Sequence, residues 1–527
     1  PKTSSAASDV YKRQILEQPP EIPTYPTSRQ WHNIMLSAKS APALERMKEN
    51  LAAHLAENSE QPLADIAYTL QLGRQDFEYR FSATCDSREQ LTEQLKSINV
   101  SDCFSAQATE EQKDIVFLFP GQGSQYIGMG RELYQEEPVF KQHIDDCCTR
   151  LTSHLDIDLR ELIYADPDAS DNEQKTEQLS AQLSAQLRDT QYAQIALFIT
   201  EYALAKLWMS WGVMPTKMIG HSIGEYVAAC LSGVIALDDA LKVVVLRGKL
   251  MNEMPSGSML SVSLSTKELS AYLNDRLWHA VQNGEDMQVV SGALEDIEQL
   301  QRTLDEKGIQ NSRLHTSHGF HSGLMAEAAS GFGKIMADIP LNAPGIPFAS
   351  NLTGQWATPE LVCQPDYWAK QLRSTVRFGD NIQLLKQDVT PAICLEVGPG
   401  NVLCSLAKKQ LSKTSMIVAS LPNAKSSNAK SNSAKSTHSK SAHAKSTHAK
   451  SAHKEQLILT QAIGKMWCAG AQVSWAKYYA DETRNRVCLP TYSFEKKRYW
   501  FDSKISELPA TDSSEAAENA HLDTSPV

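Results

Sequence analysis

Apolar residues along this chain recur with a helical period in some stretches and form short unbroken runs in others. Residues 41–57 (APALERMKENLAAHLAE) place their leucines and methionine on one face of a helix. Residues 191–212 (QYAQIALFITEYALAKLWMSWG) are apolar nearly all round, which predicts a helix at the centre of a core. Residues 115–119 (IVFLF) predict a buried strand that runs into the glycine-rich loop PGQGSQ. This pattern favours an α/β fold, and the helices with short extended pieces between residues 34 and 95 favour an α+β unit ahead of it.

A second predicted strand leads into a turn that carries a serine. Residues 213–220 (VMPTKMIG) read as a short strand, and residues 223–233 (IGEYVAACLSG) read as a helix that ends at a glycine. Ser222 lies between them in a Gly-X-Ser-X-Gly pattern, which alone is weak but in this context is typical of a nucleophile elbow. The serine hydroxyl would lie at the helix N-terminus, where free N–H groups face developing negative charge. We therefore predict a nucleophilic Ser222 on a hydrolase-like parallel sheet.

Between residues 256 and 316 the pattern indicates a separate small unit. The expected order is strand, helix, strand, strand, helix, strand, at residues 259–265, 266–276, 277–283, 287–293, 294–308 and 309–316. That order is the ferredoxin-like plan. We predict that this unit is inserted into the serine-bearing domain and that the cleft between the two binds the ligand.

A serine nucleophile needs a base, and three histidines follow the inserted unit in HTSHGFHSGLM: His315, His318 and His321. Any one histidine in such a stretch is most often simply packed in a loop or core. His321 is distinguished because it lies where the chain re-enters the larger domain and follows the serine in chain order, as in hydrolase elbows. No Asp or Glu stands out as a third member. We expect a Ser222–His321 dyad whose imidazole is oriented by another group, such as a backbone carbonyl.

Composition and charge exclude several classes of function. The chain has 527 residues, 42% hydrophobic and 21% charged, as expected for a soluble globular protein of about three domains. No apolar run is long enough to span a membrane, and no secretory leader is recognisable. The net charge of −11 argues against general nucleic-acid binding. The ten cysteines are scattered without a C-x-x-C pair, which predicts no disulfide framework, no metal site and a reducing, cytoplasmic location.

Residues 423–454 form a segment of Lys, Ser, Ala, Asn, Thr and His. Six of its seven lysines recur every five residues from Lys425 to Lys450, and it has no acidic residue, so the rest of the chain carries −18. With almost no large apolar side chain, it cannot offset the entropy cost of ordering, and we expect a mobile linker. We also expect residues 1–14 to be an assembly scar and the chain to be a piece of a larger protein.

Six motifs occur in order along the chain: FPGQGSQYIGMG, GHSIGEYVAAC, VVVLRGKLM, TSHGFHSGLM, SNLTG and EVGPGNVL. Together they resemble the malonyl-CoA:acyl carrier protein acyltransferase family, and more narrowly the acyltransferase domain of a modular type I polyketide synthase. The segment before the first motif resembles the linker that follows a ketosynthase. LPTYSFEKKRYWF resembles the post-acyltransferase segment that wraps back over that linker. The resemblance covers roughly residues 34–501.

The resemblance and the patterns above imply an organisation of the chain. The expected parts are an assembly scar (1–14), a ketosynthase–acyltransferase linker domain (15–112), a hydrolase-like acyltransferase subdomain (113–255 and 317–422), a ferredoxin-like subdomain (256–316), the lysine-rich linker (423–454), a post-acyltransferase segment (455–502) and a disordered tail (503–527).

The resemblance also implies a role for individual residues. Ser222 would attack the thioester of malonyl-CoA, and His321 would take its proton and later activate the phosphopantetheine thiol of an acyl carrier protein. The backbone N–H groups of Gln122 and Ile223 would hold the oxyanion. Arg247 would bind the malonyl carboxylate through its guanidinium fork, although without the family match a surface salt bridge is the simpler interpretation. No tightly bound cofactor and no metal are implied.

Two positions bear on the choice of extender unit. Ile223 and the HGFH stretch, with His318 and Phe320, resemble the malonyl-specific pattern, in which a bulky Phe crowds the α-carbon. Methylmalonyl-type domains have Gln and a Tyr-Ala-Ser-His stretch instead. Gly319 stands where the malonyl pattern has Ala, and the missing methyl is expected to enlarge or loosen the pocket. Because excluding one methyl is worth only about 1–3 kcal/mol, we expect a strong but leaky malonyl preference, with methylmalonyl as an alternative.

Two other classes of function stay open. An acyl hydrolase or editing enzyme would use the same dyad with water as acceptor, and Arg247 and the post-acyltransferase segment argue against it. A non-catalytic docking piece is the second, and an intact Ser222 and His321 argue against that. The expected partners are an acyl carrier protein and a neighbouring ketosynthase domain of the same synthase, with no nucleic acid and no membrane.

Overall fold

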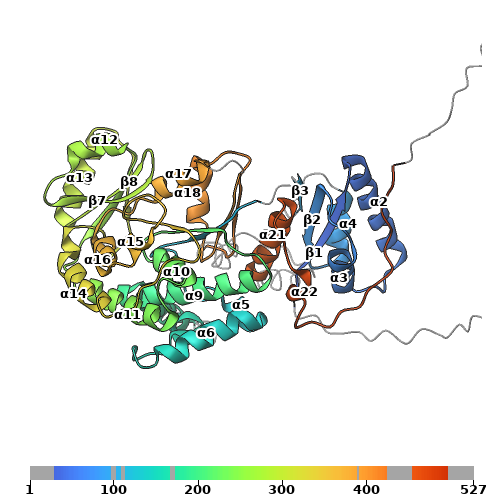
Figure 1. Ribbon diagram of the computed structural model, residues 1–527, viewed down its shortest axis with the longest axis horizontal. Coiled ribbons are helices and arrows are strands. Elements are labelled where there is room, and N and C mark those ends of the chain that lie inside the picture. The colour runs from blue at the N-terminus through green and yellow to red at the C-terminus, as the bar shows by residue number, and fades with distance from the viewer. Residues whose placement is uncertain are drawn as a thin grey trace, which may run out of the picture.

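The computed structural model describes residues 29–96, 103–108, 113–165, 173–387, 391–423 and 454–495. The predicted scar (1–14), the tail (503–527) and residues 424–453 of the lysine-rich linker lie outside the described residues. The described part has a smaller N-terminal unit at one end and a larger α/β unit at the other, with helix α21 (Lys454–Cys468) between them (Figure 1).

A five-stranded parallel sheet forms the centre of the larger unit. Its order is β10-β5-β4-β11-β12, and every neighbouring pair is parallel. The strands are β4 (Ile115–Phe119), β5 (Lys217–Gly220), β10 (Phe348–Ala349), β11 (Ile393–Glu396) and β12 (Met416–Ala419). The chain builds outward from β4 through β5 to β10 and then crosses back to β11, so the strand order reverses next to β4. Ligands in open α/β sheets bind beyond the carboxyl ends of strands at such a reversal. The predicted parallel-sheet core is confirmed.

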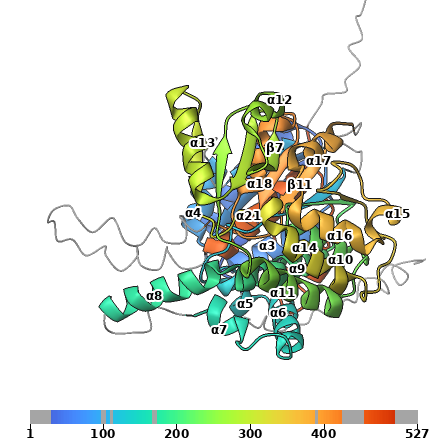
Figure 2. The same cartoon turned by 90° about the vertical axis from the view of Figure 1, so that its left-hand side faces the viewer.

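Helices pack against this sheet, and α9 (Thr190–Ser210) is the most buried of the long ones. It packs between α6 and α11, and most of its side chains are inaccessible, as its apolar sequence predicted. Figure 2 shows the inserted unit on one side of this part and α5 to α7 on the other. The remaining helices are α5 (Arg131–Glu136), α6 (Pro138–Leu151), α7 (Leu159–Ile163), α8 (Glu173–Arg188), α10 (Gly224–Leu231), α11 (Leu237–Asn252), α14 (Ala326–Met336), α15 (Pro359–Val362), α16 (Pro365–Arg373), α17 (Phe378–Leu384) and α18 (Val402–Gln410).

The inserted unit has the predicted β-α-β-β-α-β order and an antiparallel sheet of order β7-β8-β6-β9. Its elements are β6 (Ser258–Val262), α12 (Thr266–Leu269), β7 (Leu277–Gly284), β8 (Met287–Gly292), α13 (Leu294–Glu306) and β9 (Asn311–Leu314). The helix predicted over 266–276 is wrong in length, because α12 is one turn followed by a 3₁₀ turn. The Asn274 Oδ1 atom accepts a hydrogen bond from the Arg276 N–H at 2.8 Å, a local turn that competes with further helix.

The N-terminal unit is α+β, as predicted. A three-stranded antiparallel sheet, β1-β2-β3, is covered by three helices and has a hydrophobic core of its own. Its elements are β1 (His32–Ala38), α2 (Ala41–Glu57), α3 (Leu63–Gly73), β2 (Tyr79–Cys85), α4 (Arg88–Lys96) and β3 (Cys103–Gln107). The boundaries expected between the parts of the chain stay predictions.

The C-terminal segment returns over the N-terminal unit. After α21 and the short α22 (Trp475–Tyr478), residues 485–493 run along α2 and α3 (Figure 1). The Val487 N–H donates to Thr69 Oγ1 at 3.0 Å, and Arg74 donates to the Pro490 carbonyl at 3.1 Å. The expected wrapping of the post-acyltransferase segment is therefore present in the described residues.

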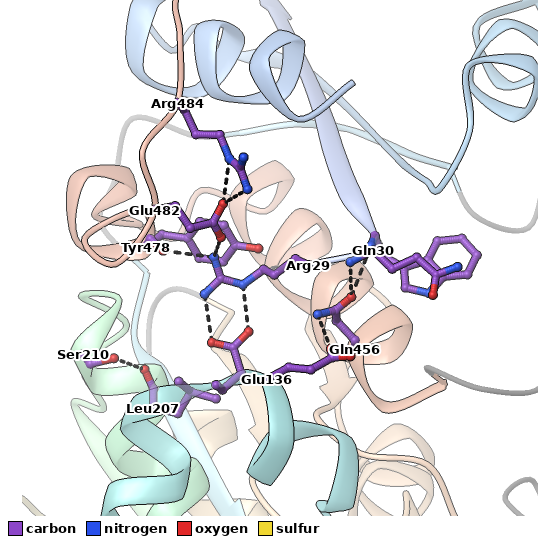
Figure 3. A network of polar contacts seen from close by, with 11 residues as sticks. Arg29, Gln30, Glu136, Leu207, Ser210, Gln456, Tyr478, Glu482 and Arg484 are labelled. Carbon is purple, nitrogen blue, oxygen red and sulfur yellow. Dashed lines mark hydrogen bonds and ion pairs between the residues drawn. The ribbon is translucent and has the colours of Figure 1, made fainter. Parts of the chain in front are cut away.

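One buried arginine joins the N-terminal unit, the larger α/β unit and the C-terminal segment. Arg29, at the start of the described N-terminal unit, makes two hydrogen bonds to Glu137 at 2.7 and 2.8 Å, and Glu137 precedes α6 in the larger unit. The same guanidinium donates to Glu482 and to the Tyr478 carbonyl in the C-terminal segment and lies 4.1 Å from the Tyr478 ring centre. Figure 3 shows Arg29 pointing toward Tyr478 and Glu482, with Arg484 on the far side of Glu482. This contact, the Arg29 junction, fixes the units against one another.

Candidate active site

Ser222 lies on the turn between β5 and α10, at the carboxyl edge of the parallel sheet. Its φ is 53°, and Ser222 and His321 (φ 54°) are the two non-glycine residues with positive φ in the described part of the chain. Such a conformation costs roughly 1–3 kcal/mol and persists only where the surroundings hold it. The flanking glycines permit the tight turn, because a Cβ on Gly224 would lie 2.2 Å from the Phe119 carbonyl oxygen and one on Gly220 would lie 2.2 Å from the Glu225 nitrogen. The predicted elbow geometry is present.

The Ser222 Oγ atom lies 2.7 Å from His321 Nε2, although the two residues are 99 positions apart. On the other side of the ring, His321 Nδ1 lies 3.0 Å from the Ser374 carbonyl oxygen. Because a carbonyl accepts, Nδ1 carries the proton and Nε2 is free to accept from the serine. The imidazole is thus oriented by a backbone carbonyl, the kind of partner that the sequence analysis expected.

Burial keeps this imidazole neutral. Loss of hydration, followed by the charges of Arg247 and His221, lowers the pKa of His321 to about 3. Loss of hydration lowers the pKa of His221 to about 4 as well. A neutral His321 near pH 7 can take a proton from Ser222, as a general base requires.

The backbone N–H groups of Gln122 and Ile223 have no hydrogen-bond partner among the described residues. Gln122 follows β4 in the glycine-rich loop, and Ile223 precedes the first residue of α10. Free N–H groups at the ends of neighbouring strands and at a helix N-terminus can stabilise an oxyanion. The structure therefore leaves both residues of the expected oxyanion hole available.

Arg247 projects from α11 and has a fully buried side chain. Its Nη1 donates to Gln194 Oε1, while Nε and Nη2 have no hydrogen-bond partner in the described part of the chain. The guanidinium lies 5.3 Å from the Tyr226 ring centre, and burial lowers the pKa of Arg247. The surface salt bridge considered for this residue is wrong. A buried cation with two free donors is costly unless an anion binds there.

His318 and Phe320 are buried in the stretch that leads to His321. His318 Nδ1 lies 2.8 Å from Ser317 Oγ, and the two rings are 5.8 Å apart. Their hydrogen bonds and ring contacts are with these neighbours rather than with Ser222 or Arg247. A Cβ on Gly319 would lie 2.9 Å from Leu324 Cδ1 and 3.0 Å from Ser291 Oγ. The enlargement expected from the missing methyl is therefore not found at this point, because neighbouring atoms fill its place.

Three further residues support the site and were assigned no role from sequence. Asn351 Oδ1 accepts from the Ser222 N–H at 2.7 Å, Ser374 holds His321, and Gln194 holds Arg247. Asn351 belongs to the SNLTG motif, so its place in the motif was visible but not its partner. A backbone carbonyl such as that of Ser374 leaves no signal in the residue type.

Comparisons with known proteins agree with this geometry. The acyl transferase domain family matches residues 116–453, and a family described as CurL-like, PKS C-terminal matches residues 32–95. A subunit of the phenolphthiocerol/phthiocerol polyketide synthase of Mycobacterium tuberculosis is 31% identical over 89% of this chain. The type I polyketide synthase Pks15/1 of Mycobacterium marinum is 32% identical over 94% of this chain. The chain spans 30% and 21% of the lengths of these two relatives.

Solved structures show the same likeness. The acyl transferase domain of ZmaA is 35% identical, with a TM-score of 0.76 over 88% of this chain and 100% of that one. The acyl transferase domain of SpnD, in complex with 2-(pent-4-yn-1-yl)malonyl, is 28% identical, with a TM-score of 0.70 over 85% and 98%. The malonyl CoA-acyl carrier protein transacylase of Coxiella burnetii is 27% identical, with a TM-score of 0.51 over 58% and 93%.

The parallel sheet, the serine elbow and these matches define the chain as a member of the acyl transferase domain family. Within that family it is an acyltransferase domain of a modular type I polyketide synthase, accompanied by flanking linker segments. No helix in the described ranges is long and apolar enough to cross a membrane.

Proposed function

We propose that this domain transfers malonyl from malonyl-CoA to the phosphopantetheine thiol of an acyl carrier protein. The observation that carries the proposal is the buried Arg247, which has two donors without a partner among the described residues and whose charge lowers the pKa of His321. A planar guanidinium fork suits a carboxylate and would select a dicarboxylic acyl group over acetyl. The malonyl carboxylate would supply the anion that this buried cation lacks.

The chemistry proceeds in two half-reactions through one ester. The Ser222 hydroxyl attacks the thioester carbonyl while His321 Nε2 takes its proton, and the oxyanion binds the N–H groups of Gln122 and Ile223. The carbon–sulfur bond breaks, and the imidazolium returns the proton to the leaving thiolate of CoA. In the second half-reaction His321 takes the proton of the pantetheine thiol, which attacks the ester, and the proton passes back to Ser222 Oγ.

The extender choice rests on packing beside the nucleophile. Ile223 and Phe320 are both buried. Because a bulky side chain that crowds the α-carbon disfavours an extra methyl, we propose malonyl over methylmalonyl, with a preference limited to about 1–3 kcal/mol. The carrier protein and a ketosynthase domain of the same synthase are the proposed partners.

The direct test is intact-protein mass after brief exposure to malonyl-, methylmalonyl- and acetyl-CoA in competition, with Ser222→Ala as control. We expect a malonyl adduct that is absent from the control and moves to added carrier protein. A methylmalonyl adduct would overturn the extender choice but keep the mechanism. Malonyl-CoA hydrolysed at the same rate with and without carrier protein would identify a hydrolase, and no adduct from a folded protein would favour the docking piece.

A further inference from the structure

The backbone of Ser222 is held from both sides by side chains of other elements. Its N–H donates to Asn351 Oδ1 at 2.7 Å, and its carbonyl accepts from Gln371 Nε2 at 2.9 Å. Asn351 follows β10, and Gln371 lies in the last turn of α16. Both contacts act on the peptide groups that flank the strained φ of 53°.

The orientation of the Gln371 carboxamide follows from its partners. Nε2 donates both to the Ser222 carbonyl and, at 3.0 Å, to Glu225 Oε2. Turning the amide over would place its oxygen against the Ser222 carbonyl, which cannot donate. In the observed orientation Gln371 Oε1 is buried without a hydrogen-bond partner among the described residues. An unpaired buried acceptor costs about 1–3 kcal/mol, so stability alone does not explain this side chain.

Glu225 anchors the carboxamide in turn. Its carboxylate is fully buried and also accepts from the Tyr367 hydroxyl and from the Asn351 N–H at 3.3 Å. Tyr367 and Gln371 are one helical turn apart on α16, and Glu225 lies in the first turn of α10 behind the serine. The two residues whose side chains hold Ser222 are thus both tied to the Glu225 carboxyl group, Gln371 through its side chain and Asn351 through its backbone N–H.

The same end of α16 also holds the base. Ser374, directly after the helix, supplies the carbonyl 3.0 Å from His321 Nδ1. One short segment, residues 371–374, therefore contacts both members of the dyad, which other elements contribute. A displacement of about 1 Å at reacting groups lowers a rate on the order of 100-fold. Residues 371–374 therefore control a distance on which the rate depends, that between Ser222 Oγ and His321 Nε2.

We propose that Gln371, anchored by Glu225, is a positioning residue that holds the left-handed Ser222 backbone so that the serine hydroxyl stays within hydrogen-bond distance of His321. This proposal rests on the proposed function for the identity of the reaction. The reactivity of the Ser222 hydroxyl, which the proposal concerns, does not depend on it. The Gln371 side chain touches no reacting atom and acts through the Ser222 carbonyl, while the Gln371 backbone, which also faces the His321 ring, is unchanged in the variants below.

The first test uses Gln371→Met, which removes the donor at nearly constant size. A fluorophosphonate probe reports the reactivity of Ser222 without any malonyl group, and single-turnover acylation by malonyl-CoA reports the proposed reaction. We expect both rates to fall on the order of 10- to 100-fold, with the half-saturating malonyl-CoA concentration unchanged because Arg247 is intact. Gln288→Met is the matched control, since Gln288 is equally buried and donates to the Gly284 carbonyl at 2.9 Å in the inserted unit.

The second variant, Gln371→Glu, keeps the shape and makes the donor depend on a proton. The new carboxyl faces the Ser222 carbonyl and Glu225, whose own pKa burial raises to about 7, with Tyr367, Arg247 and His321 nearby. Burial beside Glu225 raises the pKa of the new carboxyl as well. Only its protonated form donates to Ser222. We therefore expect the ratio of its labelling rate to that of the parent protein to rise as pH falls from 8.5 to about 5.5, which a purely structural role would not produce.

The outcomes separate this inference from the proposed function. Slow probe labelling of folded Gln371→Met, with normal labelling of Gln288→Met, supports the positioning role even if the parent protein forms no malonyl adduct. Labelling of folded Gln371→Met within twofold of the parent rate overturns the role, and so does an equal loss in both methionine variants. Thermal unfolding of each variant shows that the compared samples are folded.

Discussion

At the scale of single residues, this site combines groups that are individually unfavourable. Ser222 and His321 have left-handed backbones. Among the described residues, the buried Arg247 forms no ion pair, although the charge of Glu225 acts on it, and Gln371 Oε1 accepts no hydrogen bond. Each of these features costs stability in the free protein. Such groups are expected where the complementary partner is a substrate or a transition state rather than another part of the fold.

Arg247 gives the sharpest prediction at this scale. We expect Arg247→Leu to leave the free energy of unfolding unchanged or higher, because an apolar group replaces a buried charge that forms no ion pair among the described residues. We also expect acylation of Ser222 by malonyl-CoA to slow by roughly 10- to 100-fold for each charge-assisted hydrogen bond lost, while acetyl-CoA is affected little. Urea unfolding and competitive acylation followed by mass measure the two effects. Equal losses with both acyl groups would contradict the carboxylate role.

At the scale of elements, the elbow depends on how closely α10 approaches β4 and β5. The second glycine of the Gly-X-Ser-X-Gly pattern is needed for this close approach, since a side chain at Gly224 would meet the Phe119 carbonyl of the neighbouring strand. The strand order places the loop after β4, with Gln122, directly beside the elbow after β5. Two short segments distant in sequence thereby meet at the site that we propose for the oxyanion.

This clearance makes Gly224→Ala a test of the element packing. Overpacking usually costs about 1–3 kcal/mol, and a clash with backbone should reach or exceed the upper end of that range. Gly331, in the middle of α14, is the matched control, because its Cβ would make only ordinary contact with Leu250 at 3.5 Å. Gly331→Ala should be stabilising by up to about 1 kcal/mol through helix propensity. Chemical denaturation compares the two, and equal stabilities would show that α10 can shift away.

At the scale of the whole molecule, the Arg29 junction binds the N-terminal unit, the α/β unit and the C-terminal segment together. Arg29 bridges Glu137 and Glu482, whose side chains are 2% and 8% exposed, so water does little to screen these charges. The C-terminal segment then continues along α2 and α3. The relative placement of the units therefore depends on a few buried polar contacts as well as on apolar packing.

We expect Arg29→Met to destabilise the chain by roughly 3–5 kcal/mol, because Glu137 is left as a buried charge without a partner, while Glu482 keeps Arg484. Arg150→Met is the control: its side chain is 40% exposed and its pairs with Asp146 and Asp238 lie at the surface, where the change should stay within about 0.5 kcal/mol. Thermal unfolding measures both. A cost for Arg29→Met no larger than for Arg150→Met would show that apolar packing alone fixes the units.

Much of the fold was predictable because its signals are local. The apolar run of β4, the all-round apolar α9, the strand-turn-helix around Ser222 and the β-α-β-β-α-β order each depend on residues close together in sequence. Backbone hydrogen bonding and side-chain period are local properties, so they can be recognised without knowing the fold. The length predicted for the helix at α12 was wrong because it concerned a helix end, where a single side-chain contact at Asn274 outweighs propensity.

The sequence by itself thus determined the elements, the candidate nucleophile and base, and the motifs that resemble an acyltransferase. Only the tertiary structure decided that Ser222 and His321 meet at 2.7 Å, that Ser374 and Gln371 hold them from one end of α16, and that Arg247 is buried with free donors. These facts depend on how distant elements pack, and packing is a property of the whole core rather than of any window of sequence.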